Sequence, residues 1–302
     1  MKLRVQAPAT TANLSCGFDV LGLALDLFFW VEVEVFEERL FLLTHQGEGE
    51  GEIPEDENNL FFKAVGRTWE RLGFEGMGLK VKAQNAIPVA RGLGSSAACI
   101  AAGVTVANTL SGGELTLEEM LEVALPLEGH PDNIVPAFLG GFTIALLREG
   151  KVLYRRIPFL SSLHLYALVP DYSLSTELMR RALPTSYSRE DVVFSLQHLA
   201  FLLGSIFEQS IEGFLQALED RIHEPYRGKY VVGFEEVKSY VRRRGLGGAT
   251  ISGSGPTILL FLTQPLKDSE AKEIEEIFSH LGATVSVREV HPWEKGVEVE
   301  VL

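Results

Sequence analysis

Polar and apolar side chains alternate over several short segments near the start of the chain, which is the pattern of strands with one buried face. Residues 2–7 and 79–84 alternate in this way, and residues 25–36 and 40–44 are rich in apolar side chains. A loop rich in glycine and glutamate follows at residues 47–57. These segments predict four strands in the first third of the chain.

Helical signals lie between and after these strands. Residues 60–72 have the spacing of an amphipathic helix, and residues 95–110 are a run of small residues with helical character. Thr116 and Glu119 have the spacing of a capping box, which predicts a third helix that bends or ends at Pro126.

The rest of the chain continues the mixture of helices and strands. A loop is predicted at residues 128–133, and a tight hairpin is predicted at Glu149-Gly150. The later predicted elements are a strand at 163–169, helices at 175–183, 188–219 and 233–244, strands near 249–252 and 257–262, a helix at 269–281, and strands near Val285 and Val297. This order is typical of an α+β fold. Because 302 residues exceed the usual size of one core, we expect two domains, at residues 1–158 and 159–302, that share a cleft.

Composition limits the possible classes of protein. With 46% apolar and 23% charged residues, the chain can fold without help from metals or disulfides. Cys16 and Cys99 are far apart and lack CxxC spacing, so we interpret them as reduced, structural residues of a cytoplasmic protein. The N-terminus lacks the apolar core of a signal peptide, and the apolar stretches 20–35 and 196–218 are interrupted by polar residues, so we expect no membrane anchor.

The formal net charge of the chain is −14. Proteins that bind the backbone of nucleic acids carry a basic face, so this charge argues against a nucleic-acid partner. If the protein binds phosphate, it must do so through a local site.

A glycine- and serine-rich loop is the strongest local signal in the sequence. Alternate glycines let the backbone approach a ligand, and serines at the start of a helix add hydroxyls to its free N–H groups, which together attract polyphosphate. A tight turn into a closely packed helix is the alternative interpretation. The candidate nucleotide contacts in this loop are Pro88, Val89, Ala90, Arg91, Gly92, Leu93, Gly94, Ser95, Ser96, Ala97 and Ala98.

Two common phosphate motifs do not account for this loop. No Gly-Lys-Ser/Thr follows the glycines, so it is not a Walker A loop. Residues 92–97 satisfy G-x-G-x-x-A, but the acidic residue expected about 20 positions later is Glu114, which lies next to a helix cap and not at the end of a strand. The dinucleotide interpretation therefore fails on its context.

The loop resembles the nucleotide loop of the GHMP kinases, a family of small-molecule kinases. Two further segments resemble the first and third motifs of that family, namely residues 8–14 with Gly17-Phe18-Asp19, and residues 251–257. The resemblance implies ATP as phosphate donor, Mg²⁺ as metal ion, a ribosomal S5 domain 2-like N-terminal domain and a ferredoxin-like C-terminal domain.

Further segments are similar to one branch of this family. These are residues 128–133, Ser175-Thr176 with Arg180, and residues 224–229. The branch resemblance implies L-homoserine as the small-molecule substrate, phosphorylation of its side-chain hydroxyl in threonine biosynthesis, a cytoplasmic location and a homodimer.

Homoserine is a zwitterion, so its pocket needs an anion for the ammonium group and a cation for the carboxylate. By resemblance Asp19 faces the ammonium, while Arg180 and Arg227 hold the carboxylate, which a guanidinium can bind through two hydrogen bonds. A surface ion pair is the alternative role for each residue alone. The other expected substrate contacts are Asn13, His130, Asn133 and Gly253.

The resemblance also assigns the metal and catalytic roles. Glu128 and Ser96 are the expected Mg²⁺ ligands, and Asn59 is the expected adenine contact, although it could equally be a helix N-cap. A transition-metal site at Glu128, His130 and Asp132 is disfavoured because no further His or Cys set is near.

Placement and charge neutralisation dominate phosphoryl transfer, so we expect no strong general base. The expected catalytic residues are Glu128, Asn133 and Thr176, of which Asn133 and Thr176 orient the hydroxyl. A kinase of the same family acting on mevalonate or a sugar, or a non-catalytic member that only binds ligand, are the alternative functions.

Overall fold

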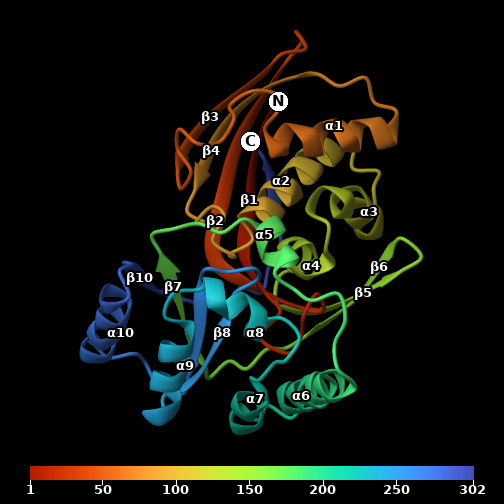
Figure 1. Cartoon of the computed structure of the whole chain (residues 1–302). Helices are drawn as coiled ribbons and strands as arrows, with labels where there is room; N and C mark the ends of the chain where they lie inside the picture. The colour runs from red at the N-terminus through yellow and green to blue at the C-terminus, as the bar shows by residue number, and fades with distance from the viewer.

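The first sheet contains most of the N-terminal part of the chain. A computed structural model describes residues 1–302 (Figure 1). The strands of this sheet are β1 (Lys2–Ala12), β2 (Leu21–Phe36), β3 (Phe41–Gly47), β4 (Gly78–Asn85), β5 (Phe142–Arg148), β6 (Lys151–Ile157) and β11 (Glu298–Val301). They run in the order β11-β1-β2-β4-β3, and β2 also pairs with β5, which pairs with β6. All of these pairs are antiparallel except β3 with β4.

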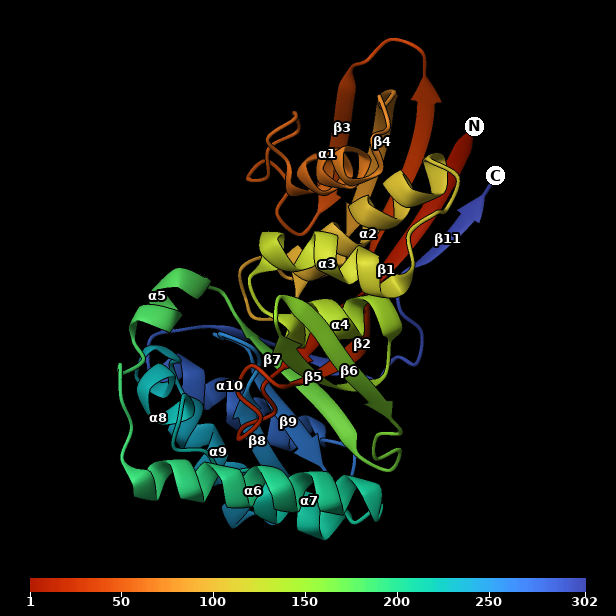
Figure 2. The same cartoon turned by 90° about the vertical axis from the view of Figure 1, so that its right-hand side faces the viewer.

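Four helices lie along one side of this sheet (Figure 2). They are α1 (Leu60–Leu72), α2 (Ser95–Leu110), α3 (Leu117–Glu128) and α4 (Pro131–Leu139). Helix α2 packs on β1 and is covered by α1 and α3, and this position explains its composition: a helix enclosed on all sides has no polar face. Its small residues also allow close approach, because Gly103 lies against the backbone of Phe61.

The second sheet consists of β7 (His164–Pro170), β8 (Gly247–Ile251), β9 (Ile258–Leu262) and β10 (Val285–Val290). Its order is β10-β7-β9-β8, and every pair is antiparallel. The helices α9 (Phe234–Arg243) and α10 (Asp268–His280) form a core with one of its faces. This arrangement confirms the predicted α+β class with a ferredoxin-like C-terminal part.

The last strand returns to the first sheet. Residues 298–301 form β11, which pairs with β1 near both ends of the chain. The division into two domains at residue 158 stays a prediction. If the chain is divided there, the C-terminal domain contributes one strand, β11, to the N-terminal sheet.

The elements that follow β7 in the chain, before α9, are α5 (Thr176–Arg181), α6 (Arg189–Phe207), α7 (Ile211–Ala217), α8 (Glu224–Arg227) and the 3₁₀ turn η1 (Gly228–Tyr230). The prediction of one helix over residues 188–219 was wrong. The chain leaves α6 at Glu208, passes through Gln209 with a φ of 56°, and starts α7 at Ser210, whose side chain accepts from the N–H of Gly213. The loop predicted at residues 128–133 was also wrong in part, because α4 begins at Pro131.

The local cap and turn predictions are confirmed. Asn59 caps α1 by accepting from the N–H of Phe61, and Thr116 and Glu119 form a reciprocal capping box on α3. Glu149 and Gly150 connect β5 to β6 with positive φ angles, which suit a tight hairpin.

Helix α6 differs from the other helices in its exposed apolar face. By length and composition alone this helix of 19 residues could cross a membrane, with a mean hydropathy of 1.3 over its most apolar 18 residues. Of those residues, 22% are buried in the fold. Its inner face packs against α7 and includes Ser195, whose hydroxyl donates to Asp220. The outer face carries exposed Leu196, Phe201 and Phe207.

Candidate active site

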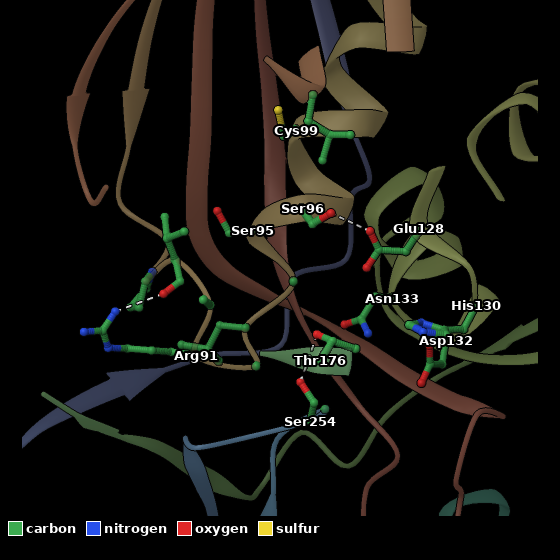
Figure 3. A pocket seen from close by; sticks show the side chains of 18 of the residues that line it. Arg91, Ser95, Ser96, Cys99, Glu128, His130, Asp132, Asn133, Thr176 and Ser254 are labelled. Carbon is green, nitrogen blue, oxygen red and sulfur yellow. Dashed lines mark hydrogen bonds and ion pairs between the residues drawn. The ribbon is translucent and has the colours of Figure 1, made fainter. Parts of the chain in front are cut away.

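One cavity of about 450 Å³ lies where the segments between the sheets meet (Figure 3). Its wall is formed by the loop before α1, the glycine- and serine-rich loop, the ends of α3 and α4, the loop after β1, and residues from α5, α8 and the turn before β9. The three segments that resemble family motifs therefore meet in one pocket, although they lie far apart in sequence, at residues 8–19, 88–98 and 251–257.

The glycine- and serine-rich loop forms one side of the cavity. Gly94, with a φ of 67°, is the N-cap of α2, so the first N–H groups of this helix lack partners within the helix. A Cβ on Gly94 would lie 1.8 Å from Oγ1 of Thr10, and a Cβ on Gly92 would lie 2.2 Å from the carbonyl oxygen of Ser252. These glycines therefore also let the loop pack against β1 and the third motif.

Three predicted nucleotide contacts of this loop have side chains that are engaged or buried elsewhere in the fold. The Arg91 guanidinium donates to the carbonyl oxygens of Val89, Pro170 and Asp171, which ties the loop to the end of β7. Ala97 and Ala98 are fully buried in the first turn of α2, and their side chains take no part in the cavity wall.

Asn59 lies in the cavity wall at the start of α1, and both ends of its amide are used. Its Oδ1 caps the helix at 2.8 Å from the nitrogen of Phe61, and its Nδ2 donates to the carbonyl oxygen of Pro54 at 2.6 Å. The N-cap role is confirmed, while contact with adenine stays a prediction.

Glu128 and Ser96 meet at the head of α2. The Ser96 hydroxyl donates to Oε2 of Glu128 at 2.7 Å. Burial raises the pKa of Glu128, and the hydrogen bond from Ser96 opposes that shift. The structure contains no cluster of three or more His, Cys, Asp or Glu side chains around one point. A carboxylate and a hydroxyl are hard oxygen donors, and they fit a Mg²⁺ ion whose other ligands are phosphates and water.

Asp19 and Arg180 form an ion pair on the other side of the cavity. Nη2 of Arg180 lies 2.7 Å from Oδ1 of Asp19, and Nη1 lies 3.2 Å from Oδ2. Nε of Arg180 donates to Nε2 of His130 at 2.9 Å. Burial, followed by the charge of Arg180, lowers the pKa of His130 to about 4, so this imidazole is neutral near pH 7.

Arg227 is the other cation of this region and is only 2% exposed. It donates to the carbonyl oxygens of Met179 and Gly253, and its guanidinium lies 5.0 Å from the centre of the Phe18 ring. Burial and the nearby charge of Arg180 lower its pKa to about 10, so it remains charged at neutral pH. Its Nη2 makes no hydrogen bond within the chain.

The predicted polar neighbours also lie in this region. Asn13 donates to the carbonyl oxygen of Gly253 at 2.7 Å and accepts from the backbone N–H of Asp19. Asn133 accepts a hydrogen bond from the Thr10 hydroxyl at 2.8 Å, which fixes its Oδ1 as the acceptor and leaves its Nδ2 as a donor.

Thr176 approaches the cavity from the start of α5. Its hydroxyl lies 3.3 Å from the hydroxyl of Ser254. All the predicted substrate and catalytic residues therefore line one cavity, and their individual roles stay predictions.

Several residues of the wall were not assigned a role from the sequence. Asp132 is the most notable, because it is 3% exposed and its side chain makes no hydrogen bond. Burial, followed by the charges of Asp19 and Glu128, raises its pKa to about 7. Its place beside Asn133, within residues 128–133 that resemble the family branch, was the available signal. The remaining unassigned wall residues are Ile53, Pro54, Asn58, Leu60, Cys99 and Ser254.

Comparison with known proteins places the chain among small-molecule kinases. Residues 59–141 match the GHMP kinases N terminal domain, and residues 202–284 match the GHMP kinases C terminal domain. The chain is 38% identical to the homoserine kinase of Petrotoga mobilis over 98% of its own length and 96% of that protein. It is 36% identical to the homoserine kinase of Clostridium botulinum strain ATCC 19397, with 95% of each chain covered.

Solved structures agree with this result. The crystal structure of homoserine kinase from Cytophaga hutchinsonii superposes with a TM-score of 0.86 and 28% identity, covering 99% of this chain and 97% of that one. Mevalonate kinase from L. major, solved in complex with R-mevalonate, gives a TM-score of 0.72 at 16% identity, with 95% of each chain covered. The second likeness shows the shared fold alone.

Proposed function

The chain belongs to the GHMP kinase family, on its homoserine kinase branch, and from this premise we propose that it transfers the γ-phosphoryl group of ATP to the side-chain hydroxyl of L-homoserine. The product is O-phospho-L-homoserine, and the reaction belongs to threonine biosynthesis. The observation that carries the proposal is that the ion pair of Asp19 with Arg180 and the buried cation Arg227 lie in the cavity that the glycine- and serine-rich loop also lines.

An α-amino acid head group can join this arrangement without changing its net charge. Its ammonium group lies one carbon from its carboxylate, just as Asp19 lies next to Arg180. The ammonium would bind Asp19, and the carboxylate would bind Arg180 and the free Nη2 of Arg227. Mevalonate has a carboxylate but no ammonium, so it would leave Asp19 without a new partner. This charge argument favours homoserine over the mevalonate and sugar alternatives.

The donor side of the reaction depends on the backbone more than on charged side chains. Phosphates of ATP would bind the free N–H groups at the start of α2, next to the hydroxyls of Ser95 and Ser96. When bound, Mg²⁺ would neutralise charge on the phosphates, and Glu128 with Ser96 would hold it. These oxygen ligands also argue against a non-catalytic member of the fold, because binding alone does not need them.

The acceptor hydroxyl needs orientation more than deprotonation. Asn133 has its Nδ2 free to donate, since its Oδ1 accepts from Thr10, and Thr176 presents a hydroxyl from α5. We assign the hydroxyl of homoserine to these two residues, which would aim it at the γ-phosphate held above α2. Closeness and alignment then supply most of the rate enhancement.

A substrate panel tests this proposal directly. Release of ADP is measured with Mg²⁺ and ATP in the presence of L-homoserine, mevalonate, galactose or no acceptor. We expect kcat/KM for L-homoserine to exceed the others by at least about 100-fold, because a site with paired charges strongly rejects an analogue that lacks one of them. Faster turnover of mevalonate, or no acceptor-dependent turnover at all, would refute it.

We also propose that the protein is a homodimer that associates through the outer face of α6. Val192, Leu196, Phe207 and their neighbours form an apolar stripe along this helix, and Leu196 and Phe207 are 59% and 84% exposed. A helix of 19 residues is about 28 Å long, so an antiparallel copy can cover the whole stripe with the same residues on both sides. Apolar contact of this kind is typical of permanent interfaces.

The dimer is tested with Leu196→Glu in light scattering coupled to gel filtration. We expect a dimer for the natural protein and a monomer for the variant, while Lys272→Glu, at an exposed position of α10, remains dimeric. A monomeric natural protein would refute the dimer, and a dimeric Leu196→Glu would move its interface elsewhere.

Two broader assignments complete the proposal. We assign the protein to the cytoplasm, in line with two cysteines that are both unpaired. We also assign residues 1–158 and 159–302 to two domains, with β11 as the one strand that crosses back.

A further inference from the structure

The loop that carries Asp19 has an unusual backbone. Between β1 and β2, the non-glycine residues Asn13, Leu14, Ser15 and Asp19 have φ angles of 73°, 43°, 66° and 57°. Non-glycine residues rarely adopt this left-handed conformation, so surrounding contacts must hold the loop in this shape. The contacts at the front of the loop belong to the site already described, and those at its back do not.

The back of the loop rests on a buried pair of residues from the segment before α9. The Ser15 hydroxyl donates to Oε2 of Glu224 at 3.2 Å, and the Ser15 carbonyl accepts from Nε2 of His223 at 2.7 Å. The His223 ring also stacks on Phe18, with ring centres 5.3 Å apart. Ser15 and His223 are fully buried, and Glu224 is 2% exposed.

Glu224 is itself held from two other directions. Its Oε1 accepts from the backbone N–H of Ile251 at 3.2 Å, and its Oε2 accepts from Nζ of Lys238 at 3.2 Å. Asp220 accepts from the backbone N–H groups of His223 and Glu224 at 2.6 and 2.9 Å, which fixes the start of α8. The carboxylate of Glu224 therefore joins three separate segments of the chain at one point.

This point lies directly behind both charge-binding groups of the cavity. Glu224 and Arg227 are three residues apart on α8, so one helical turn links the support of the Asp19 loop to the buried cation. The strand end at Ile251 continues to Gly253, whose carbonyl accepts from both Asn13 and Arg227. A shift of Glu224 would therefore change the separation of Asp19 and Arg227.

We propose that Glu224, together with Ser15 and His223, forms a positioning clamp that fixes the Asp19 loop relative to Arg227 and so sets the charge spacing that the acceptor must match. This inference rests on the proposed function, because it concerns the acceptor side of that site. The clamp touches no part of the nucleotide side, since none of its three residues lines the cavity.

A purely structural ion pair is the competing explanation. Lys238 also pairs with Glu219, so loss of Glu224 could simply lower stability. Ser15→Ala distinguishes the two explanations, because it removes the hydrogen bond from the Ser15 hydroxyl to Glu224 and leaves both ion pairs of Lys238 intact. Glu219→Gln is the matched control, since it alters the same lysine without touching the loop.

The experiment compares Ser15→Ala, Glu224→Gln, their double variant and Glu219→Gln. We expect the first two each to raise the KM for L-homoserine about tenfold, with the KM for ATP within about twofold, because a displaced loop weakens acceptor binding only. The KM of the double variant for L-homoserine should not exceed that of the more affected single variant, since both substitutions act on the same contact between Ser15 and Glu224. Glu219→Gln should match the natural protein in both constants.

Amide hydrogen exchange gives a readout that does not depend on the substrate. We expect faster exchange over residues 13–19 in Ser15→Ala and Glu224→Gln, while exchange in α2 of these variants stays unchanged. In Glu219→Gln, exchange over residues 13–19 should match that of the natural protein. Unchanged exchange in this loop would overturn the clamp, whichever acceptor the enzyme uses. Equal increases in both KM values together with a lower melting temperature would also overturn it, in favour of general stability. Absence of homoserine turnover in the natural protein would instead refute the proposed function.

Discussion

The two sides of the cavity are built in different ways. The nucleotide side comes mainly from one continuous segment, residues 88–96, and offers backbone N–H groups and hydroxyls. The acceptor side comes from the loop after β1, the start of α4, the helices α5 and α8, and the turn before β9, and it offers charged side chains. Under the proposed function, a local motif binds the triphosphate, whereas the small zwitterion needs charges brought together from distant segments.

The two sides also differ in their charge when no ligand is bound. On the acceptor side Asp19 and Arg180 neutralise each other, and neutral His130 accepts from Arg180. On the nucleotide side the only arginine of the loop, Arg91, donates to three backbone carbonyls, which hold it against the end of β7. The acceptor side is thus prepared for a ligand that carries both charges, and the nucleotide side is prepared for an anion.

The largest effect should come from Gly94→Val on the nucleotide side. A Cβ at this φ of 67° is strained and would collide with Thr10, so the loop must move away from its phosphate-binding position. We expect ATP affinity to fall by at least about 100-fold, together with a lower melting temperature. Titration calorimetry with an ATP analogue and a melting curve measure the two effects.

Gly245→Val is the matched control for this variant. Gly245 has a nearly identical φ of 66°, but a Cβ there would meet nothing within 4 Å. It should show the backbone strain without any loss of ATP binding. If Gly94→Val binds ATP normally, the phosphates bind elsewhere and the nucleotide side is wrongly assigned.

The next effect separates the two arginines of the acceptor side. Arg227→Ala removes a cation that is 2% exposed, and we expect homoserine binding to weaken by about 3 kcal/mol, or roughly 100-fold. Arg180→Ala removes one that is 35% exposed, so we expect a smaller loss of about 2 kcal/mol. ATP affinity should barely change in either variant.

Homoserine KM and ATP affinity are measured for both arginine variants. Arg181→Ala is the control, because this neighbour of Arg180 is 77% exposed and pairs only with Glu177. Lost ATP binding in Arg227→Ala would show that this arginine reaches the phosphates, and the contrast between the two sides would then disappear.

A smaller effect should arise at Glu128, on the border between the two sides. Glu128→Gln keeps the size of the side chain and a hydrogen-bond acceptor for Ser96 but removes the charge. We expect the Mg²⁺ concentration for half-maximal rate to rise about tenfold, because one anionic ligand is lost. A Mg²⁺ titration of the rate measures this effect. Glu122→Gln on the same helix is the control, and an unchanged titration for Glu128→Gln would remove this residue from the metal site.

The smallest effect concerns stability and pH at Asp132. Burial raises the pKa of this carboxyl to about 7 in the folded protein, above its value in the unfolded chain. Its contribution to stability is therefore complete below about pH 4 and is lost as pH rises through about 7. Asp132→Asn removes the titration, so it should gain about 1 kcal/mol or more relative to the natural protein between pH 5 and pH 8.

Melting curves of the two proteins without ligand, at pH 5 and pH 8, test this prediction. A constant difference in stability between the two pH values would show that Asp132 ionises normally. The acceptor side would then carry a second anion, in addition to Asp19, opposite the two cations Arg180 and Arg227.

Much of the local structure could be predicted because its causes lie within a few residues. The Asn59 cap, the box of Thr116 with Glu119 and the hairpin at Glu149 depend on neighbours in sequence, and all are observed. A prediction failed where the apolar pattern was continuous but the helix was not. Apolar residues run through residues 188–219, yet the helix stops at Glu208 because the following turn packs α7 back against α6.

The site shows the same division. The glycine-rich loop and the motifs that resemble the family predicted most of the residues that line the cavity, because each motif is a short segment that can be recognised locally. The pairing of Asp19 with Arg180, 161 residues apart, depends on where the loop after β1 meets α5. The isolation of Asp132 and the use of Arg91 as a structural tie likewise depend on which groups surround them. Burial and partners set the charge state and freedom of a side chain, and both are properties of the assembled fold that no local pattern contains.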